Sequence, residues 1–102
     1  MTNEKQFLSL LGLAQKAGKL VSGEVAVEKA VKNGCAKILL IAGDSSDGAK
    51  KNYLDMAKYY QMPVYIVLSK DQLGMSIGKA NRAALAVTDL GFSKAIGKIL
   101  TT

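Results

Sequence analysis

The sequence predicts an α/β sandwich built around a small, mostly parallel sheet. Segments in which apolar residues recur with the helical period alternate with short, continuous apolar runs, the pattern of buried strands. Two such runs, K-I-L-L-I-A and V-Y-I-V-L, are bounded by turn residues. With 102 residues, 49% of them apolar, the chain can form one domain, residues 1–102, whose core needs neither disulfide nor metal.

The first two elements are a helix and a short strand. Apolar residues between Phe7 and Ala17 recur with the helical period, and Gly18 ends the segment. Leu20–Val21 follows as a short strand-like piece.

The second helix is predicted to begin at Ser22–Gly23. The Ser22 hydroxyl would cap it, and Gly23 would take the first helical position. One face is apolar, and a second face, expected to be exposed to solvent, carries Glu24, Glu28 and Lys32 at a spacing of four residues. Asn33–Gly34 ends the helix, because glycine tolerates the left-handed conformation found there.

The start of this helix is a candidate anion site. Its free backbone N–H groups and the positive end of its dipole can hold a phosphate. Lys19 lies just before the helix, and Lys29 and Lys32 lie further along it.

The middle of the chain contains two strands that we expect to be buried, at Lys37–Ala42 and Val64–Leu68. A loop, Gly43–Gly48, and a helix, Ala49–Gln61, connect them. The inner side of that helix is expected to carry Tyr53 or Leu54, Ala57 and Tyr60.

The C-terminal part contains a short helical turn, a third buried strand and a last helix. Ser69 and Gln72 have the spacing of a capping box. Ala83–Thr88 is the strand, and Asp89 can cap the helix that follows it. That helix has one apolar face, formed by Phe92, Ala95, Ile96, Ile99 and Leu100.

The charge balance favours a polyanionic partner. The formal net charge is +6, from 14 basic and 8 acidic residues, and nucleic acid is the commonest polyanion that basic proteins bind. Thirteen of the basic residues are lysines, and Arg82 is the single arginine. Lysine acts as a point charge suited to phosphates, whereas reading of base edges favours arginine.

Several function classes have no support in the sequence. There is no histidine, the commonest general base and zinc ligand, so we expect no metal site, no cofactor and no catalytic set. Cys35, the single cysteine, is expected to be a buried structural thiol in a reducing, cytoplasmic compartment. We see no signal peptide and no apolar stretch long enough to span a membrane, so no membrane partner is expected.

The loop from Gly43 to Lys50 superficially resembles a phosphate-binding P-loop. Its G-x-x-x-x-G spacing is right, but Ala49 displaces the lysine by one position. Asp44 and Asp47 would also face the phosphates. We therefore interpret this segment as a turn followed by a capped helix.

Two other loops are expected to meet at one edge of the sheet and to form the binding site. One is Ser22–Gly23–Glu24, and the other is the segment from Gln72 to Arg82. The second loop carries Lys79, Asn81 and Arg82 beside two glycines that allow close approach of another backbone. A tight loop with solvated charges is the alternative.

Five segments in order show a resemblance that covers almost the whole chain: K-L-V-S-G, K-A-V-K-N-G-C-A-K-I-L-L-I-A, M-P-V-Y-I-V, L-G-M-S-I-G-K and A-L-A-V-T-D-L-G. They resemble the ribosomal protein family of the L7Ae and L30e type, which binds kink-turns and related RNA, and in particular its small stand-alone bacterial members. The resemblance implies a three-layer α-β-α sandwich around a four-stranded mixed sheet. It also implies an RNA-binding protein, with ribosomal RNA or the ribosome as partner, that acts as a monomer.

The resemblance also implies RNA-binding residues. The helix start of the family, G-x-N-E-x-x-K, is matched by Gly23 and Lys29, but Val25 and Ala26 replace the Asn and Glu that recognise sheared G·A pairs. Glu24 is the candidate substitute for that carboxylate. The L-G-x-x-x-G pattern is matched by Leu73, Gly74 and Gly78, and the positions that touch flipped-out nucleotides fall on the residues from Lys79 to Arg82.

These residues suggest shape recognition of a bent RNA, in which lysines neutralise phosphates and the glycine loop covers unstacked bases. We expect the Lys29 and Arg82 side chains to be exposed. One alternative is a protein-interaction module whose basic surface meets an acidic protein. Another is a fragment of an RNA methyltransferase, some of which carry a substrate-binding domain of this fold, but the sequence contains no cofactor-binding domain.

Overall fold

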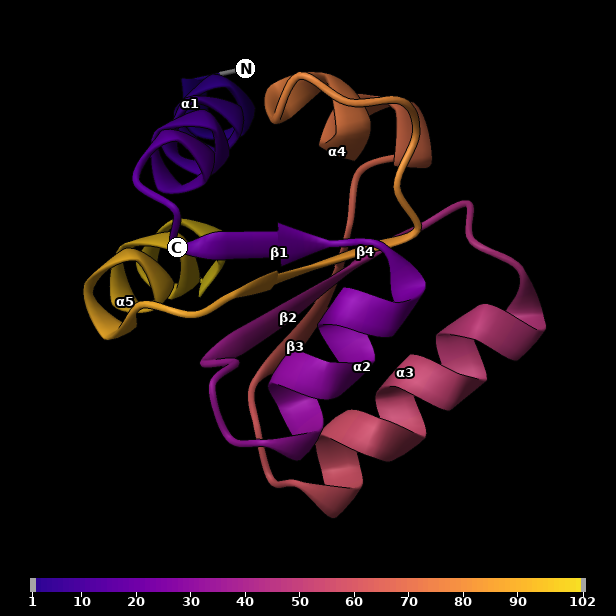
Figure 1. The fold of residues 1–102 in the computed structure, drawn as a ribbon. Helices are drawn as coiled ribbons and strands as arrows, with labels where there is room; N and C mark the ends of the chain where they lie inside the picture. The colour runs from indigo at the N-terminus through magenta and orange to yellow at the C-terminus, as the bar shows by residue number, and fades with distance from the viewer. Residues whose placement is uncertain (1, 102) are drawn as a thin grey trace.

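The computed structural model describes residues 2–101 as three layers around one sheet (Figure 1). Helices α1, α4 and α5 cover one face of the sheet, and α2 and α3 cover the other. In chain order the elements are α1 Thr2–Lys16, β1 Leu20–Ser22, α2 Glu24–Lys32, β2 Ile38–Ala42, α3 Asp47–Tyr59, β3 Val64–Val67, α4 Lys70–Ser76, β4 Ala84–Val87 and α5 Leu90–Thr101.

The sheet is mixed, with the strand order β1-β4-β2-β3. Only β2 and β3 pair in parallel, whereas β4 runs antiparallel to both of its neighbours, β1 and β2. The four-stranded mixed sheet implied by the family resemblance is therefore confirmed, and the mostly parallel sheet inferred from element order is wrong. Element order shows which segments are strands but not their directions, and β4 starts at the end of the sheet where β2 and β3 end.

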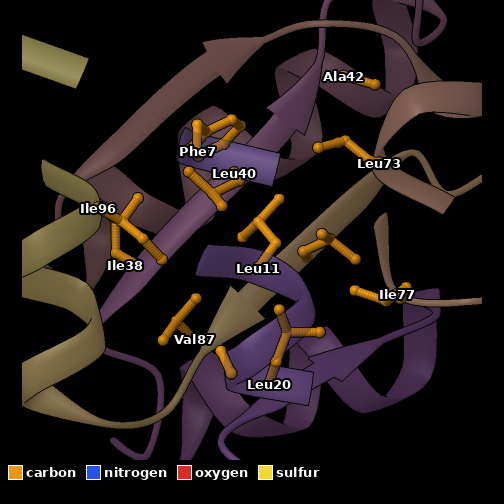
Figure 2. Packing of buried hydrophobic residues seen from close by; sticks show 12 residues of the cluster. Phe7, Leu11, Leu20, Ile38, Leu40, Ala42, Leu73, Ile77, Val87 and Ile96 are labelled. Atoms are coloured by element: carbon orange, nitrogen blue, oxygen red, sulfur yellow. The ribbon is translucent and has the colours of Figure 1, made fainter. Parts of the chain in front are cut away.

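Alternate residues of the two central strands supply the two halves of the core. Ile38 and Leu40 of β2 face α1, α4 and α5, together with Leu85 and Val87 of β4 (Figure 2). Phe7 and Leu11 of α1 pack onto them, and each of these side chains is almost completely buried. Burial of one such side chain contributes about 1.5–3 kcal/mol.

The opposite half of the core lies under α2 and α3. Leu39 and Ile41 of β2 face this side, with the small residues Ala84 and Ala86 of β4. Val27 and Val31 are the buried contacts of α2, and Tyr53 and Ala57 are those of α3. The choice between Tyr53 and Leu54 for the inner face is thus resolved in favour of Tyr53, while Leu54 and Tyr60 are exposed.

β3 differs from its predicted burial because it is an edge strand. Ile66 is 50% exposed and no residue of the strand is fully buried. The apolar composition of Val64–Leu68 could not distinguish an edge strand from a central one, since both are rich in β-branched residues.

Several capping predictions are confirmed. The Ser69 hydroxyl accepts a hydrogen bond from the Gln72 N–H, and the Gln72 side chain accepts one from the Ser69 N–H, which completes the capping box. The Asp89 carboxylate accepts a 2.8 Å bond from the Phe92 N–H at the start of α5. Helix α3 starts two residues earlier than expected, because the Ser46 hydroxyl caps it by accepting a bond from the Ala49 N–H.

Within residues 2–101, none of the helices combines the length and apolar character that a membrane span requires.

Among the glycines of residues 2–101, Gly74 of α4 has the nearest backbone neighbour, because it lies directly against the Ala80 carbonyl group. A methyl group on Gly74 would overlap that oxygen, so we expect Gly74→Ala to lower the free energy of unfolding by about 1–3 kcal/mol. Gly97→Ala is the matched control, because the space around Gly97 in α5 is open. It should raise stability by about 0.5–1 kcal/mol. Urea unfolding of both variants checks this, and equal stability of Gly74→Ala and the unsubstituted protein would contradict it.

Candidate nucleic-acid interface

The candidate interface lies at one edge of the sheet, where β1, β2 and β3 end and β4 begins. The pairs Ser22–Leu85, Ile41–Ala84 and Ala42–Val67 place these strand ends side by side. Helices α2, α3 and α4 each start directly after one of these strands, so three helix N-termini converge on the same edge. Each N-terminus adds a partial positive charge, and that of α2, which no side chain caps, also adds free backbone N–H donors.

The turn from β1 into α2 is formed by a glycine rather than by a serine cap. Gly23 is the N-cap residue, with a φ of 92°, and no side chain caps the helix. The predicted role of Ser22 as a cap is therefore wrong: Ser22 is the last residue of β1, paired with Leu85. Its hydroxyl group accepts a hydrogen bond of 3.3 Å from Nε of Arg82 instead.

Arg82 connects the segment before β4 to this turn. Besides Ser22, its side chain contacts its own loop, since Nη1 donates to the Ala80 and Asn81 carbonyl oxygens at 3.2 and 2.9 Å. Its backbone N–H donates to the Lys70 carbonyl oxygen in α4. The expectation of an exposed Arg82 is corrected by this geometry: the residue is half-buried and fixed by its neighbours. Lys29, in contrast, is exposed as expected.

The apolar and glycine positions of the second loop determine its shape. The Leu73 side chain is fully buried in the core under α4. Gly74 admits the Ala80 carbonyl group, and its own carbonyl oxygen accepts a bond from the Lys79 N–H. Gly78 has a φ of 71°, in the left-handed region that glycine adopts without strain. Any ligand contact made by Leu73 would have to come from its backbone.

A groove of about 720 Å³ runs between α2 and α3 and opens at this edge. It brings together Gly23, Glu24, Lys32, Asn81 and Arg82, all of which were predicted to lie at the site. The rest of its lining consists of residues that were not predicted from the sequence, namely Glu28, Ala49, Asn52, Tyr53, Met56, Ala83 and Ala84. Only the packing of α2 beside α3 could have revealed the contribution of α3.

The charges in this groove are mixed. Lys32 Nζ lies 3.4 Å from a Glu28 carboxylate oxygen, and Glu24 and Arg82 lie in the same lining. The predicted solvent-exposed stripe of Glu24, Glu28 and Lys32 is thus the α2 wall of the groove. A ligand here meets both donors and acceptors, rather than a uniformly basic surface.

Not every predicted residue lies in the groove. Lys19 is at the opposite end of β1 from Ser22, where its carbonyl oxygen accepts a bond from the Thr88 N–H. Lys29 borders a second, smaller groove on α2 with Val25 and Asn33, which shares Glu28 and Lys32 with the first. Lys79 is exposed in the loop after α4.

The first turn of α2 presents apolar side chains to solvent. Val25 is 82% exposed, and Ala26 is also exposed. These are the positions where the resembled family has Asn and Glu, so neither side chain here can hydrogen-bond to a base. Glu24 is the polar side chain nearest to them in this turn.

The other candidate sites are accounted for by internal contacts. In the Gly43–Lys50 segment, a carboxylate oxygen of Asp44 accepts a 2.8 Å bond from the Lys70 N–H, and the Ser45 hydroxyl donates to the Ala83 carbonyl oxygen.

Cys35 is exposed, which corrects the prediction of a buried thiol. It follows the Gly34 turn, outside the apolar face of α2. Within residues 2–101, no group of three or more acidic, cysteine or histidine side chains is placed to hold a metal ion.

The model of the ribosomal protein L7Ae/L30e/S12e/Gadd45 family matches residues 5–97, and the chain belongs to that family.

Its relatives include small bacterial proteins and archaeal ribosomal proteins. The RNA-binding protein YlxQ of Bacillus subtilis is 42% identical over 95 residues, which cover 93% of this chain and 95% of the relative. The large ribosomal subunit protein eL8 of Picrophilus torridus is 31% identical over 91 residues, covering 88% of this chain and 72% of the relative.

Two solved structures share the fold. A protein of unknown function from Bacillus halodurans has a TM-score of 0.90 and 40% identity, with 94% of this chain and 97% of that chain covered. The 15.5kD RNA binding protein of Giardia lamblia has a TM-score of 0.80 with 16% identity, over 99% of this chain and 87% of that chain. The second likeness supports the three-layer fold alone.

Tyr53 provides a test of the groove electrostatics. Burial raises the pKa of its hydroxyl above the ordinary value of 10.0, and the nearby Glu24 and Glu28 carboxylates raise the pKa further. The folded protein therefore keeps this proton at pH values where the unfolded chain has lost it. This contribution to stability is fully present below pH 10.0 and is lost as the pH rises through the folded pKa.

We expect tyrosinate absorbance at alkaline pH to include a late-titrating component from Tyr53. Tyr53→Phe should remove that late component, and Glu24→Gln should move it to lower pH. Tyr59→Phe is the control, because the Tyr59 side chain is well exposed. A late component that survives Tyr53→Phe would contradict the assignment.

Proposed function

We propose that this protein is a non-enzymatic RNA-binding protein, associated with the ribosome, that recognises kink-turn or similarly bent structured RNA. The observation that carries the proposal is the junction of two loops, Ser22–Glu24 and Gly78–Arg82, through the hydrogen bond from Arg82 to Ser22. It forms one continuous surface from segments distant in the sequence. The names of the relatives, an RNA-binding protein and a ribosomal protein, support the same partner class.

The physical basis is a combination of charge and shape. A net charge of +6 attracts a polyanion, and the start of α2, which no side chain caps, offers backbone N–H groups to phosphates. The exposed Lys29 lies on the outer side of α2, where it can neutralise a second strand. A bent RNA places two backbones close together, so a surface with donors on two sides stabilises the bent state over the extended one.

Val25 and Ala26 stand at the positions where the family has the Asn and Glu that contact bases. RNA recognition by this protein must therefore depend more on other groups. Glu24 is the side chain that we propose for the sheared G·A pairs, since a carboxylate accepts hydrogen bonds from guanine N–H groups. The exposed Val25 can pack against a base or a sugar. The protein would act as a monomer in the cytoplasm, and no step of this binding requires a cofactor.

The direct test is a titration of two labelled RNAs at moderate salt with magnesium. One carries a kink-turn with tandem G·A pairs, and in the other these pairs are replaced by Watson–Crick pairs. We expect the kink-turn RNA to bind at least tenfold more tightly, about 1.4 kcal/mol. Glu24→Gln should reduce this preference, whereas Asp55→Asn, an equal charge change on the outer side of α3, should not.

The other outcomes of this titration discriminate between the alternatives. Equal, strongly salt-dependent binding of both RNAs would contradict kink-turn recognition and leave RNA binding through charge. Absence of binding to either RNA would contradict the proposal and favour a protein-interaction module.

A further inference from the structure

The Arg82 side chain donates hydrogen bonds to three acceptors within the protein. Its Nε donates to the Ser22 hydroxyl at 3.3 Å, and Nη1 donates to two carbonyl oxygens of its own loop. Three of the five N–H groups of the guanidinium are thereby used, and its plane is fixed. Nη2 has no acceptor among the residues that the structure describes, and Arg82 lines the groove at the sheet edge.

Both ends of this contact are anchored independently. Ser22 is held by its strand pairing with Leu85, and its side chain is too short to move far. The loop that carries Arg82 is fixed to α4 by backbone hydrogen bonds from the Arg82 N–H to the Lys70 carbonyl oxygen and from the Lys79 N–H to the Gly74 carbonyl oxygen. A hydrogen bond between two anchored groups restrains orientation, because neither partner can follow the other.

We infer that Ser22 is a positioning residue for RNA binding, which acts by orienting the Arg82 guanidinium so that Nη2 faces the bound RNA. This inference rests on the proposed RNA binding and specifies how one part of the site is prepared for it. Between the segments 22–24 and 78–82, this contact is the one side-chain hydrogen bond in the described part of the chain. It joins residues 60 positions apart in the sequence.

The benefit to binding is preorganisation. A free arginine loses rotamer freedom when it contacts a ligand, and that loss weakens binding, whereas an arginine fixed beforehand has already lost it. The same bond limits what Arg82 can recognise. With Nε donating to Ser22 and Nη1 to two loop carbonyl oxygens, Arg82 presents only Nη2 to a phosphate oxygen or a single base acceptor, rather than a two-nitrogen fork to guanine.

The bond length sets the size of the expected effect. At 3.3 Å the contact is slightly longer than the usual range for N–H···O bonds, so its loss should be moderate. We expect Ser22→Ala to weaken binding of the kink-turn RNA by about threefold to tenfold, the range for ordering one long side chain. Ser22→Thr, which keeps the hydroxyl group and suits a strand, should restore affinity to within about twofold.

The experiment is a double-mutant cycle read by RNA affinity and by NMR. Ser22→Ala and Arg82→Lys are made singly and together, with Ser9→Ala on the exposed side of α1 as the control. Because Arg82 is the single arginine, the protein gives one arginine Nε–H signal, which needs no assignment. In the free protein that signal should lie away from the position of a solvated arginine and exchange slowly. Ser22→Ala should move it toward that position without lowering the melting temperature by more than a few degrees.

The outcomes separate this inference from the proposed function. In the Arg82→Lys background, Ser22→Ala should have no further effect on affinity, because lysine cannot make the same contact. An equal loss in both backgrounds would show that Ser22 touches the RNA itself and would overturn the positioning role. Unchanged affinity and an unchanged Nε–H signal in Ser22→Ala would overturn it as well. If the unsubstituted protein binds no RNA, the proposed function fails, while the NMR signal still reports whether the contact exists.

Discussion

The antiparallel pairing of β4 with both β1 and β2 is the constraint on which the candidate interface depends. It places the start of β4 beside the ends of β1 and β2, so the segment 78–82 must lie against the turn into α2. A parallel β4 would begin at the opposite edge and would separate these loops by the length of the sheet. The pairing is secured by burial on both faces, since every residue of β2 and β4 is buried.

Side-chain size in β4 then shapes the groove. Its residues toward α2 and α3 are Ala84 and Ala86, whereas Leu85 and Val87 point into the other half of the core. Small side chains on one face leave room at the sheet edge, and Ala84 forms part of the groove lining between α2 and α3. The interface therefore combines a fixed backbone frame with a hollow whose charges are mixed. Such a surface distinguishes ligands by where their groups lie, in addition to their total charge.

Features that depend only on residues close together in the sequence could be predicted from the sequence. Continuous apolar runs identified β2 and β4, and the capping residues Ser69 and Asp89 marked the starts of α4 and α5. Features that depend on distant partners were missed. Serine is a common N-cap residue, and Ser22 was therefore predicted to cap α2. Its hydroxyl group instead accepts a hydrogen bond from Arg82, which lies 60 residues away in the sequence. Similarly, the edge position of β3, the direction of β4, and the exposure of Cys35 follow from packing that no local pattern specifies.

We propose that the two loops at the sheet edge form a single RNA-binding surface. Its most direct test is an NMR titration of the 15N-labelled protein with the kink-turn RNA, in which backbone amide shifts are mapped along the chain. We expect the largest changes to fall together in residues 22–29 and 78–82 and to saturate at the same RNA concentration. Changes concentrated on α1 and α5, around Lys5, Lys16, Lys94 and Lys98, would place the RNA on the opposite side of the sheet and contradict it.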